Sequence, residues 1–174
     1  MSAIRDALDP WLGPARWKQT ERSAKLIYRF QSEDQPSVPL RLKIEINTTE
    51  CFSVFGYAYK PYQVDDPWFK GIAEICTYSI EELMGTKLRA LYQRAKGRDL
   101  YDLWLGITQL NIDCNQTVAV FKKYNQFNHI NISKKEFEQN LLLKMQLQEF
   151  LRDSTVVLSN EIKWDPDKIG RAHV

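Results

Sequence analysis

The spacing of apolar residues changes near Ser79, and this change divides the chain. Before Ser79, apolar and polar residues alternate as they do in β-strands. The alternation predicts strands over 24–31, 40–47, 52–59 and 72–78. In 40–47 the even-numbered residues are apolar and the odd-numbered ones are polar, so one face of this strand is expected to be buried. Residues 1–78 are therefore predicted to form a β-rich part.

After Ser79, apolar residues recur at helical spacing. The pattern predicts helices from Ile80 to Leu91, from Arg98 to Ile107, over 115–129, and from Ser133 through Phe150. Capping boxes are predicted at two of these helix starts, where Ser79 precedes Glu82 and Ser133 precedes Glu136. The tail from Ser154 has weak periodicity and is expected to be a peripheral extension. The predicted class is α+β, with residues 79–174 as the helical C-terminal region.

Composition narrows the class of protein. The 174 residues are 44% hydrophobic and 26% charged, which supports a packed core and excludes wholesale disorder. The apolar runs are too short to span a membrane, and residues 1–20 lack the apolar segment of a secretory signal. Three widely spaced cysteines without a Cys-x-x-Cys pair argue against a zinc site or a disulfide framework. These features together predict a cytoplasmic protein without a membrane partner.

The polar face of strand 40–47 carries the first candidate site. Lys43 and Glu45 are two residues apart, so both side chains lie on the same face of the strand. A carboxylate on a rigid strand suits metal binding or phosphoryl transfer because its position is fixed. The alternative interpretation is an ordinary solvated face of an antiparallel sheet.

A run of cations in the helical region is the second candidate site. The net charge is only +2, so anion binding requires a local cluster of this kind. The run contains five cations before the next acidic residue, namely Lys87, Arg89, Arg94, Lys96 and Arg98. Such a cluster suits a triphosphate or an RNA backbone, whereas the alternative is a solvated basic helix end.

Two aspartates follow this run. Asp99 and Asp102 are three residues apart, so they lie on one side of a helix. Asp99 also stands near a helix start, where acidic residues are common for electrostatic reasons alone. Beside five cations, the two aspartates predict either a structural ion-pair network or the rim of an active site.

Both sites fit the pattern of one known family. The segment Leu42-Lys43-Ile44-Glu45-Ile46 resembles the third motif of the AbiEii toxin family of nucleotidyltransferases, a Lys-hydrophobic-Glu strand. The segment 82–104 resembles its fourth motif, Arg-x-x-x-Arg-Asp-x-x-Asp. Four residues fit that motif, namely Arg94, Arg98, Asp99 and Asp102. The resemblance covers about residues 25–150, and the order and separation of the two motifs agree with the family.

The resemblance implies a fold and a reaction. The fold would be part of a polymerase-β-like nucleotidyltransferase sheet followed by a C-terminal helical bundle. The reaction would be transfer of a nucleoside monophosphate from an NTP to RNA, with tRNA as the acceptor in some members and Mg²⁺ as the cofactor. The family also implies an antitoxin protein as a partner.

The resemblance further assigns roles to individual residues. Glu45 would be a catalytic carboxylate beside the metal, and Lys43 a supporting cation. Lys87 would bind the NTP phosphates, and Asp99 would orient the reacting groups. The remaining motif residues would contact nucleotide or RNA or lock the motif, namely Arg94, Arg98 and Asp102.

The first two motifs of the family have no match before Lys43. They are a Gly-Gly turn and a Ser-x-Asp-x-Asp segment that holds the principal magnesium ligands. The sequence therefore predicts a truncated or degenerate nucleotidyltransferase. Two alternatives stay open: a non-catalytic module that binds nucleotide, RNA or protein, and a structural protein whose ion pairs mimic the motif. A sheet without its first strands would expose an edge, so self-association or a rearranged N-terminal segment is also expected.

Overall fold

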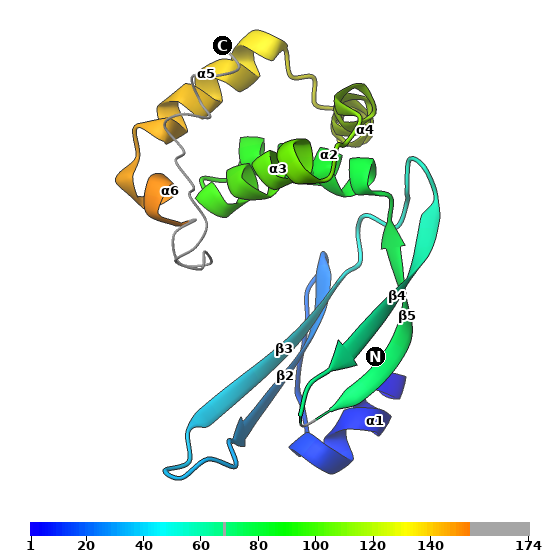
Figure 1. The fold of residues 1–174 in the computed structure, drawn as a ribbon. Helices are drawn as coiled ribbons and strands as arrows, with labels where there is room; N and C mark the ends of the chain where they lie inside the picture. The colour runs from blue at the N-terminus through cyan, green and yellow to red at the C-terminus, as the bar shows by residue number, and fades with distance from the viewer. Residues whose placement is uncertain (68, 154–174) are drawn as a thin grey trace. The chain divides into compact units, whose positions relative to one another are not determined.

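The chain forms two compact units in the computed structural model, which describes residues 1–67 and 69–153 (Figure 1). The first unit comprises residues 1–52 and the second begins at Ser53. The extension predicted from Ser154 onward lies outside the described residues.

A helix and a three-stranded sheet make up the first unit. The elements are α1 (Ser2–Leu12), β1 (Arg16–Gln19), β2 (Ser23–Gln31) and β3 (Pro39–Asn47). All strands are antiparallel, in the order β1-β2-β3. Strands β2 and β3 match the predicted strands 24–31 and 40–47, whereas the sequence analysis did not predict α1 or β1. Strand β1 pairs with β2 and forms one edge of this sheet, and the expected N-terminal rearrangement stays a prediction.

Helix α1 packs against β2 and covers only part of the apolar face of this sheet. Leu40, Leu42 and Ile46 of β3 are exposed, so the expectation that one face of this strand is buried is wrong for most of its length. Leu26 and Tyr28 of β2 are fully buried and pack with Leu12 of α1. The Tyr28 hydroxyl also donates to Asp9 Oδ1 at 2.9 Å. Since Ile4, Leu8 and Leu12 follow at intervals of four, α1 presents one apolar stripe to the sheet.

The second unit begins with a hairpin and continues with helices. Strands β4 (Tyr57–Asp65) and β5 (Lys70–Tyr78) pair antiparallel and form a separate two-stranded sheet. The helices within the described residues are α2 (Ile80–Gln93), α3 (Gly97–Gln109), α4 (Cys114–Phe127), α5 (Lys134–Met145) and α6 (Gln148–Asp153). Residues Met84, Leu91, Leu100, Leu103, Ile112 and Phe150 form the core between them.

The predicted class of α+β agrees with this architecture. Strands give way to helices at Ser79, between the end of β5 and the start of α2. The compact units nevertheless divide at Ser53, because the hairpin β4–β5 is part of the second unit. The described residues form two antiparallel sheets rather than one mixed sheet, so the polymerase-β-like sheet and the helical bundle stay predictions.

Among the described residues, none of the helices has the length and hydropathy that a bilayer crossing needs.

Two predicted elements differ from the structure. The strand expected over 52–59 begins only at Tyr57, because residues 53–55 bond to a helix side chain instead of a neighbouring strand. The helix expected from Ser133 through Phe150 is interrupted after Met145 and resumes as α6. The apolar periodicity runs through this interruption and therefore does not reveal it.

The side chain that holds residues 53–55 is Glu82 of α2, which is fully buried. Its carboxylate accepts hydrogen bonds from the Ser53 hydroxyl at 2.7 Å, the Val54 N–H at 2.7 Å and the Phe55 N–H at 3.0 Å. The Tyr124 hydroxyl of α4 donates a fourth bond at 2.8 Å. Burial alone would raise the pKa of Glu82, but these donors hold it below its ordinary value of 4.5.

This arrangement changes the predicted capping boxes. The Ser79 hydroxyl accepts from the Glu82 N–H at 3.2 Å, so one half of the first box is present. The carboxylate of Glu82 is used by the 53–55 segment and Tyr124 instead. The second box is complete, because Ser133 and Glu136 bond reciprocally.

Replacing Glu82 by Gln is expected to lower the free energy of unfolding by about 2–3 kcal/mol, since the amide turns an N–H group toward buried donors. The matched control is Glu136→Gln, an exposed cap whose loss should be about 1 kcal/mol. Urea unfolding followed by helical circular dichroism measures both. Equal losses in the two variants would contradict the role of Glu82.

The Glu82 contribution should also depend on pH. Because the folded-state pKa lies below the ordinary value of 4.5, the stabilisation is present above that value and is lost as the pH falls through the folded pKa. The difference in stability between wild type and Glu82→Gln should therefore shrink as the pH is lowered from about 6 to about 3. A constant difference over this range would contradict the lowered pKa.

Candidate functional site

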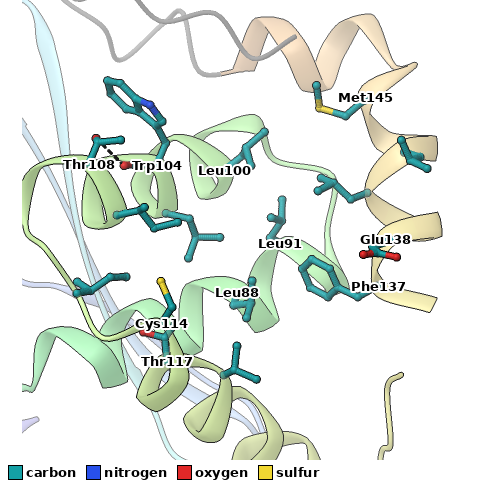
Figure 2. Close-up of a pocket in the computed structure, with 16 residues that line it drawn as sticks. Leu88, Leu91, Leu100, Trp104, Thr108, Cys114, Thr117, Phe137, Glu138 and Met145 are labelled. Carbon is teal, nitrogen blue, oxygen red and sulfur yellow. Dashed lines mark hydrogen bonds between the residues drawn. The ribbon is translucent and has the colours of Figure 1, made fainter. Parts of the chain in front are cut away.

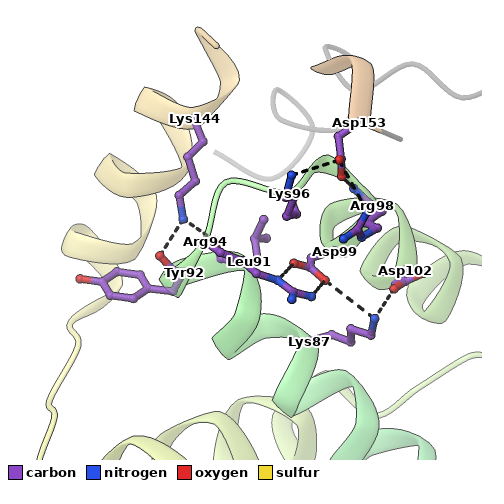
Figure 3. Close-up of polar contacts among 10 residues, drawn as sticks. All are labelled: Lys87, Leu91, Tyr92, Arg94, Lys96, Arg98, Asp99, Asp102, Lys144 and Asp153. Atoms are coloured by element: carbon purple, nitrogen blue, oxygen red, sulfur yellow. Dashed lines mark hydrogen bonds and ion pairs between the residues drawn. The ribbon is translucent and has the colours of Figure 1, made fainter. Parts of the chain in front are cut away.

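The predicted fourth motif forms a charged network between the end of α2 and the start of α3 (Figure 3). Arg94 follows the last residue of α2, and Asp99 lies in the first turn of α3, where it is fully buried. The Arg94 guanidinium bonds to both oxygens of Asp99, with Nε–Oδ2 at 2.7 Å and NH2–Oδ1 at 2.8 Å. This two-pronged bond to Asp99 raises the pKa of Arg94. It fixes the angle of the turn between the helices.

Lys87 joins the same network from α2. Its Nζ lies 2.6 Å from Asp102 Oδ2 and 3.8 Å from Asp99 Oδ1. The Lys87 side chain is 38% exposed, whereas the Asp99 side chain is fully buried. Lys87 is thus held between two carboxylates and still reaches solvent, where a ligand anion can approach it.

Of the three remaining cations of the run, Arg89 lies over the ring of Tyr124, with its Cζ 5.1 Å from the ring centre. The other two turn toward a different carboxylate. Lys96 Nζ lies 3.6 Å and Arg98 NH1 3.7 Å from Asp153 Oδ1 in α6. The Arg98 backbone N–H also donates to Asp153 Oδ2 at 3.3 Å. Arg98 therefore joins α3 to α6, whereas Asp102 pairs with Lys87. Asp153 was missed because it lies 55 residues beyond Arg98 and outside any motif.

Lys144 of α5 is a second residue that the sequence analysis missed. It is buried, and its ammonium donates to the backbone oxygens of Leu91 and Tyr92 at the end of α2 (Figure 3). Burial lowers its pKa, and the charge of Asp99 opposes that shift. A lysine at these carbonyls complements the helix dipole and fixes the end of α2 just before Arg94. Its position in the last turn of α5 is the only sequence signal for such a contact.

The predicted third motif lies on β3 in the first unit. Glu45 accepts from Lys25 of β2 at 2.7 Å and from Lys43 at 2.8 Å. Hydrogen bonds from Lys25 and then from Lys43 lower the pKa of Glu45 to about 2. Glu45 is therefore ionised at neutral pH, and each of its oxygens is bonded to an ammonium group.

The structure thus groups the seven predicted site residues into two sets. Five belong to the network of the second unit, namely Lys87, Arg94, Arg98, Asp99 and Asp102. Lys43 and Glu45 form the other set, in the first unit.

The set on β3 does not fit a resident Mg²⁺ ion. Both oxygens of Glu45 are bonded to lysines, which compete with a cation for the carboxylate. Within residues 1–67 and 69–153, no group of three or more acidic, His or Cys side chains could hold a metal. The predicted role of Glu45 as a metal ligand therefore needs oxygen ligands from another source, such as substrate phosphates.

An apolar cavity of about 350 Å³ lies between the helices of the second unit (Figure 2). Its walls include Leu88, Leu100, Trp104, Phe137 and Met145. None of the charged residues of the network lines it. Since phosphate groups need polar partners, this cavity does not suit an NTP.

Comparison with protein families gives an independent result. The family model described as "Nucleotidyl transferase AbiEii toxin, Type IV TA system" matches residues 1–169. Searches of curated proteins and of solved structures give no match.

Replacing Arg94 by Ala is expected to lower the free energy of unfolding by about 2–3 kcal/mol, because the buried carboxylate of Asp99 loses its two-pronged partner. The control is Arg98→Ala, which removes a half-exposed pair at longer distance and should cost less than about 1 kcal/mol. Chemical denaturation followed by circular dichroism measures both losses. A larger loss for Arg98→Ala would contradict this ranking of the two pairs.

Proposed function

The chain belongs to the AbiEii family of nucleotidyl transferase toxins, and on this basis we propose that it transfers a nucleoside monophosphate from an NTP to an RNA acceptor. Transfer RNA is the first acceptor to test. The proposal rests on the environment of Lys87. This half-exposed cation is held between the carboxylates of Asp99 and Asp102 on packed helices. A fixed cation of this kind can bind and orient the phosphates of an NTP.

Lys87 is the phosphate-binding group in this proposal. Its bond to Asp102 would be exchanged for one to an NTP phosphate, since Asp102 is itself 34% exposed and can be solvated when released. Asp99 keeps its bonds to Arg94 meanwhile, so the backbone of the turn does not have to move. The charge that develops on the transferred phosphate would then lie beside the Lys87 ammonium.

Asp99 and Arg94 act as positioning residues. Asp99 is fully buried and engaged through both oxygens, so it has no free atom to offer a substrate. It orients Lys87 from 3.8 Å and Arg94 by direct bonds. Arg98 contributes by joining α3 to Asp153 of α6. The predicted role of Asp99 in orienting the reacting groups therefore operates through the two cations.

Glu45 and Lys43 are proposed to meet the NTP as a charged pair on β3. Mg²⁺ binds most often through one or two carboxylates together with substrate phosphates. Glu45 would offer one carboxylate oxygen to the ion, whose remaining ligands would be oxygens from outside the described residues, and the ion would neutralise phosphate charge. Lys25 and Lys43 flank this carboxylate on the same face of the sheet.

A non-catalytic module that binds nucleotide or RNA is the second candidate. The engagement of both Glu45 oxygens by lysines favours it, because a carboxylate in that state neither binds a metal nor accepts a proton readily.

The family is one of type IV toxin–antitoxin systems, which implies a nucleotide substrate and an antitoxin partner. Self-association along a sheet edge stays a prediction.

Lys87→Ala is expected to reduce transfer of labelled nucleotide to tRNA by about 100-fold or more, as loss of one fixed charge-stabilising group typically does. Stability should change by less than about 1 kcal/mol, because the ion pairs of Lys87 are partly exposed. Lys123→Ala, which removes an exposed cation of α4, is the matched control and should transfer normally. Transfer by Lys87→Ala at the wild-type rate would overturn the role of Lys87.

Glu45→Gln separates the two candidate functions. If the chain is a transferase, the variant loses transfer to tRNA while retaining RNA binding, since the neutral amide no longer attracts the metal–NTP complex. If the chain is only a binding module, wild type and variant bind RNA and neither transfers nucleotide. Thin-layer detection of labelled nucleotide on tRNA, together with a filter-binding measurement, provides both readouts.

A further inference from the structure

The three-stranded sheet of the first unit has one face that carries all six cations of its strands. Residues that pair directly across antiparallel strands have side chains on the same face. The pairings Lys18↔Lys25↔Glu45, Arg16↔Ile27↔Lys43 and Arg29↔Arg41 therefore define one face. This face, called the basic face below, carries six cations and one carboxylate: Arg16, Lys18, Lys25, Arg29, Arg41, Lys43 and Glu45.

The opposite face explains why the basic face points away from the core. Leu26 and Tyr28 belong to it and are fully buried under α1. Because side chains alternate along a strand, burying these residues places their odd-numbered neighbours on the other side. Five of the six cations are exposed, and Lys25 is partly so.

Only two of the six cations on the basic face, Lys25 and Lys43, pair with a carboxylate of this face within the described residues. Arg29 lies directly opposite Arg41, and Lys18 directly opposite Lys25. Like charges opposite each other destabilise a sheet, whereas a solvated face built for stability alternates in sign. Within the described residues, the ion pairs on this face join Lys25 and Lys43 to Glu45, and no carboxylate pairs with Arg29 or Arg41. An external anion would remove this repulsion.

The extent of the face identifies the kind of anion. Glu45 lies four positions after Arg41 along β3, a distance of about 13 Å, and neighbouring strands are about 4.8 Å apart. The charge of a single NTP is concentrated on its triphosphate, so it would cover only one end of the basic face. A nucleic-acid backbone carries phosphates at regular short intervals and can contact cations along the whole face.

We propose that the basic face binds the backbone of the acceptor RNA, with the reacting end of the RNA at Glu45 and the chain continuing toward Arg29 and Arg41. This inference rests on the proposed function, because it assigns a surface to the acceptor of that reaction. The phosphates lie across β2 and β3 and bind through charge, so the contact is largely independent of RNA sequence. Glu45 is the one negative group among the strand residues of this face and disfavours a phosphate directly beside it.

The test removes two cations at the far end of the face from Glu45. The variant Arg29→Gln with Arg41→Gln leaves every residue assigned to transfer in place. The matched control is Arg22→Gln with Lys135→Gln, which removes the same charge from a turn and from α5, off the basic face. Fluorescence anisotropy with labelled tRNA over a range of salt concentrations gives the affinity and its salt dependence, and a separate titration measures binding of NTP.

The logarithm of the affinity falls as the logarithm of the salt concentration rises. Loss of two phosphate contacts should make this fall less steep, by about 1.4 in the slope for single-stranded and about 1.8 for duplex RNA. At about 0.1 M salt this corresponds to a loss of about 25- to 60-fold in tRNA affinity. The control should bind tRNA as wild type does, and all three proteins should bind NTP equally.

Wild-type affinity and slope in the Arg29/Arg41 variant would overturn the inference, as would equal losses in the control or an absence of tRNA binding by the wild type. Competition by polyglutamate as effective as that by tRNA would also overturn it, in favour of an acidic protein. Failure of the proposed function gives a different result, in which wild type binds tRNA through the basic face but transfers no nucleotide to it.

Discussion

Burial of the Glu82 carboxylate is the constraint on which the second unit depends. A charged group removed from water is tolerated only when its oxygens are fully hydrogen-bonded, and here four donors supply those bonds. They come from the segment before β4 and from α4, so one side chain joins both to the start of α2. Lys144 fixes the opposite end of α2 through its last carbonyls. The helix that carries Lys87 is therefore fixed at both ends.

The charged network between α2 and α3 combines a buried ion pair with a cation that reaches solvent. The bond between Arg94 and Asp99 is internal and sets the turn, because Asp99 is inaccessible to solvent. Lys87 belongs to the same network but retains access to solvent. Within this network Lys87 and Arg94 face Asp99 and Asp102, so these four charges balance. In the proposed function an anion would therefore reach Lys87 by replacing Asp102 rather than by meeting an unpaired cation. Such an exchange suits a substrate that must also leave.

In the first unit, the two faces of the sheet separate the charged side chains from the buried apolar ones. Its sheet places Leu26 and Tyr28 under α1 and all six of its strand cations on the other face. The net charge of +2 for the whole chain gives no sign of this local concentration. In the described part of the chain, acidic residues lie mainly in helices and in the segments between elements. Lys43 and Glu45 are thus part of a larger basic surface rather than an isolated pair. The pKa of about 2 for Glu45 follows from that surface, whose lysines stabilise the carboxylate.

The local pattern of apolar and polar residues determined much of the secondary structure of this protein. The change of period at Ser79, the strands β2 and β3, the main helices and the spacing of the motif aspartates are all encoded in neighbouring residues, and the sequence predicts them. It does not predict α1 or β1, although α1 has a short apolar stripe. Only the tertiary structure decided which partners the charged groups take. Glu82 bonds to residues 27 to 42 positions away, Arg98 to Asp153 and Lys144 to Leu91. Such contacts depend on how helices pack, which periodicity along the chain does not specify.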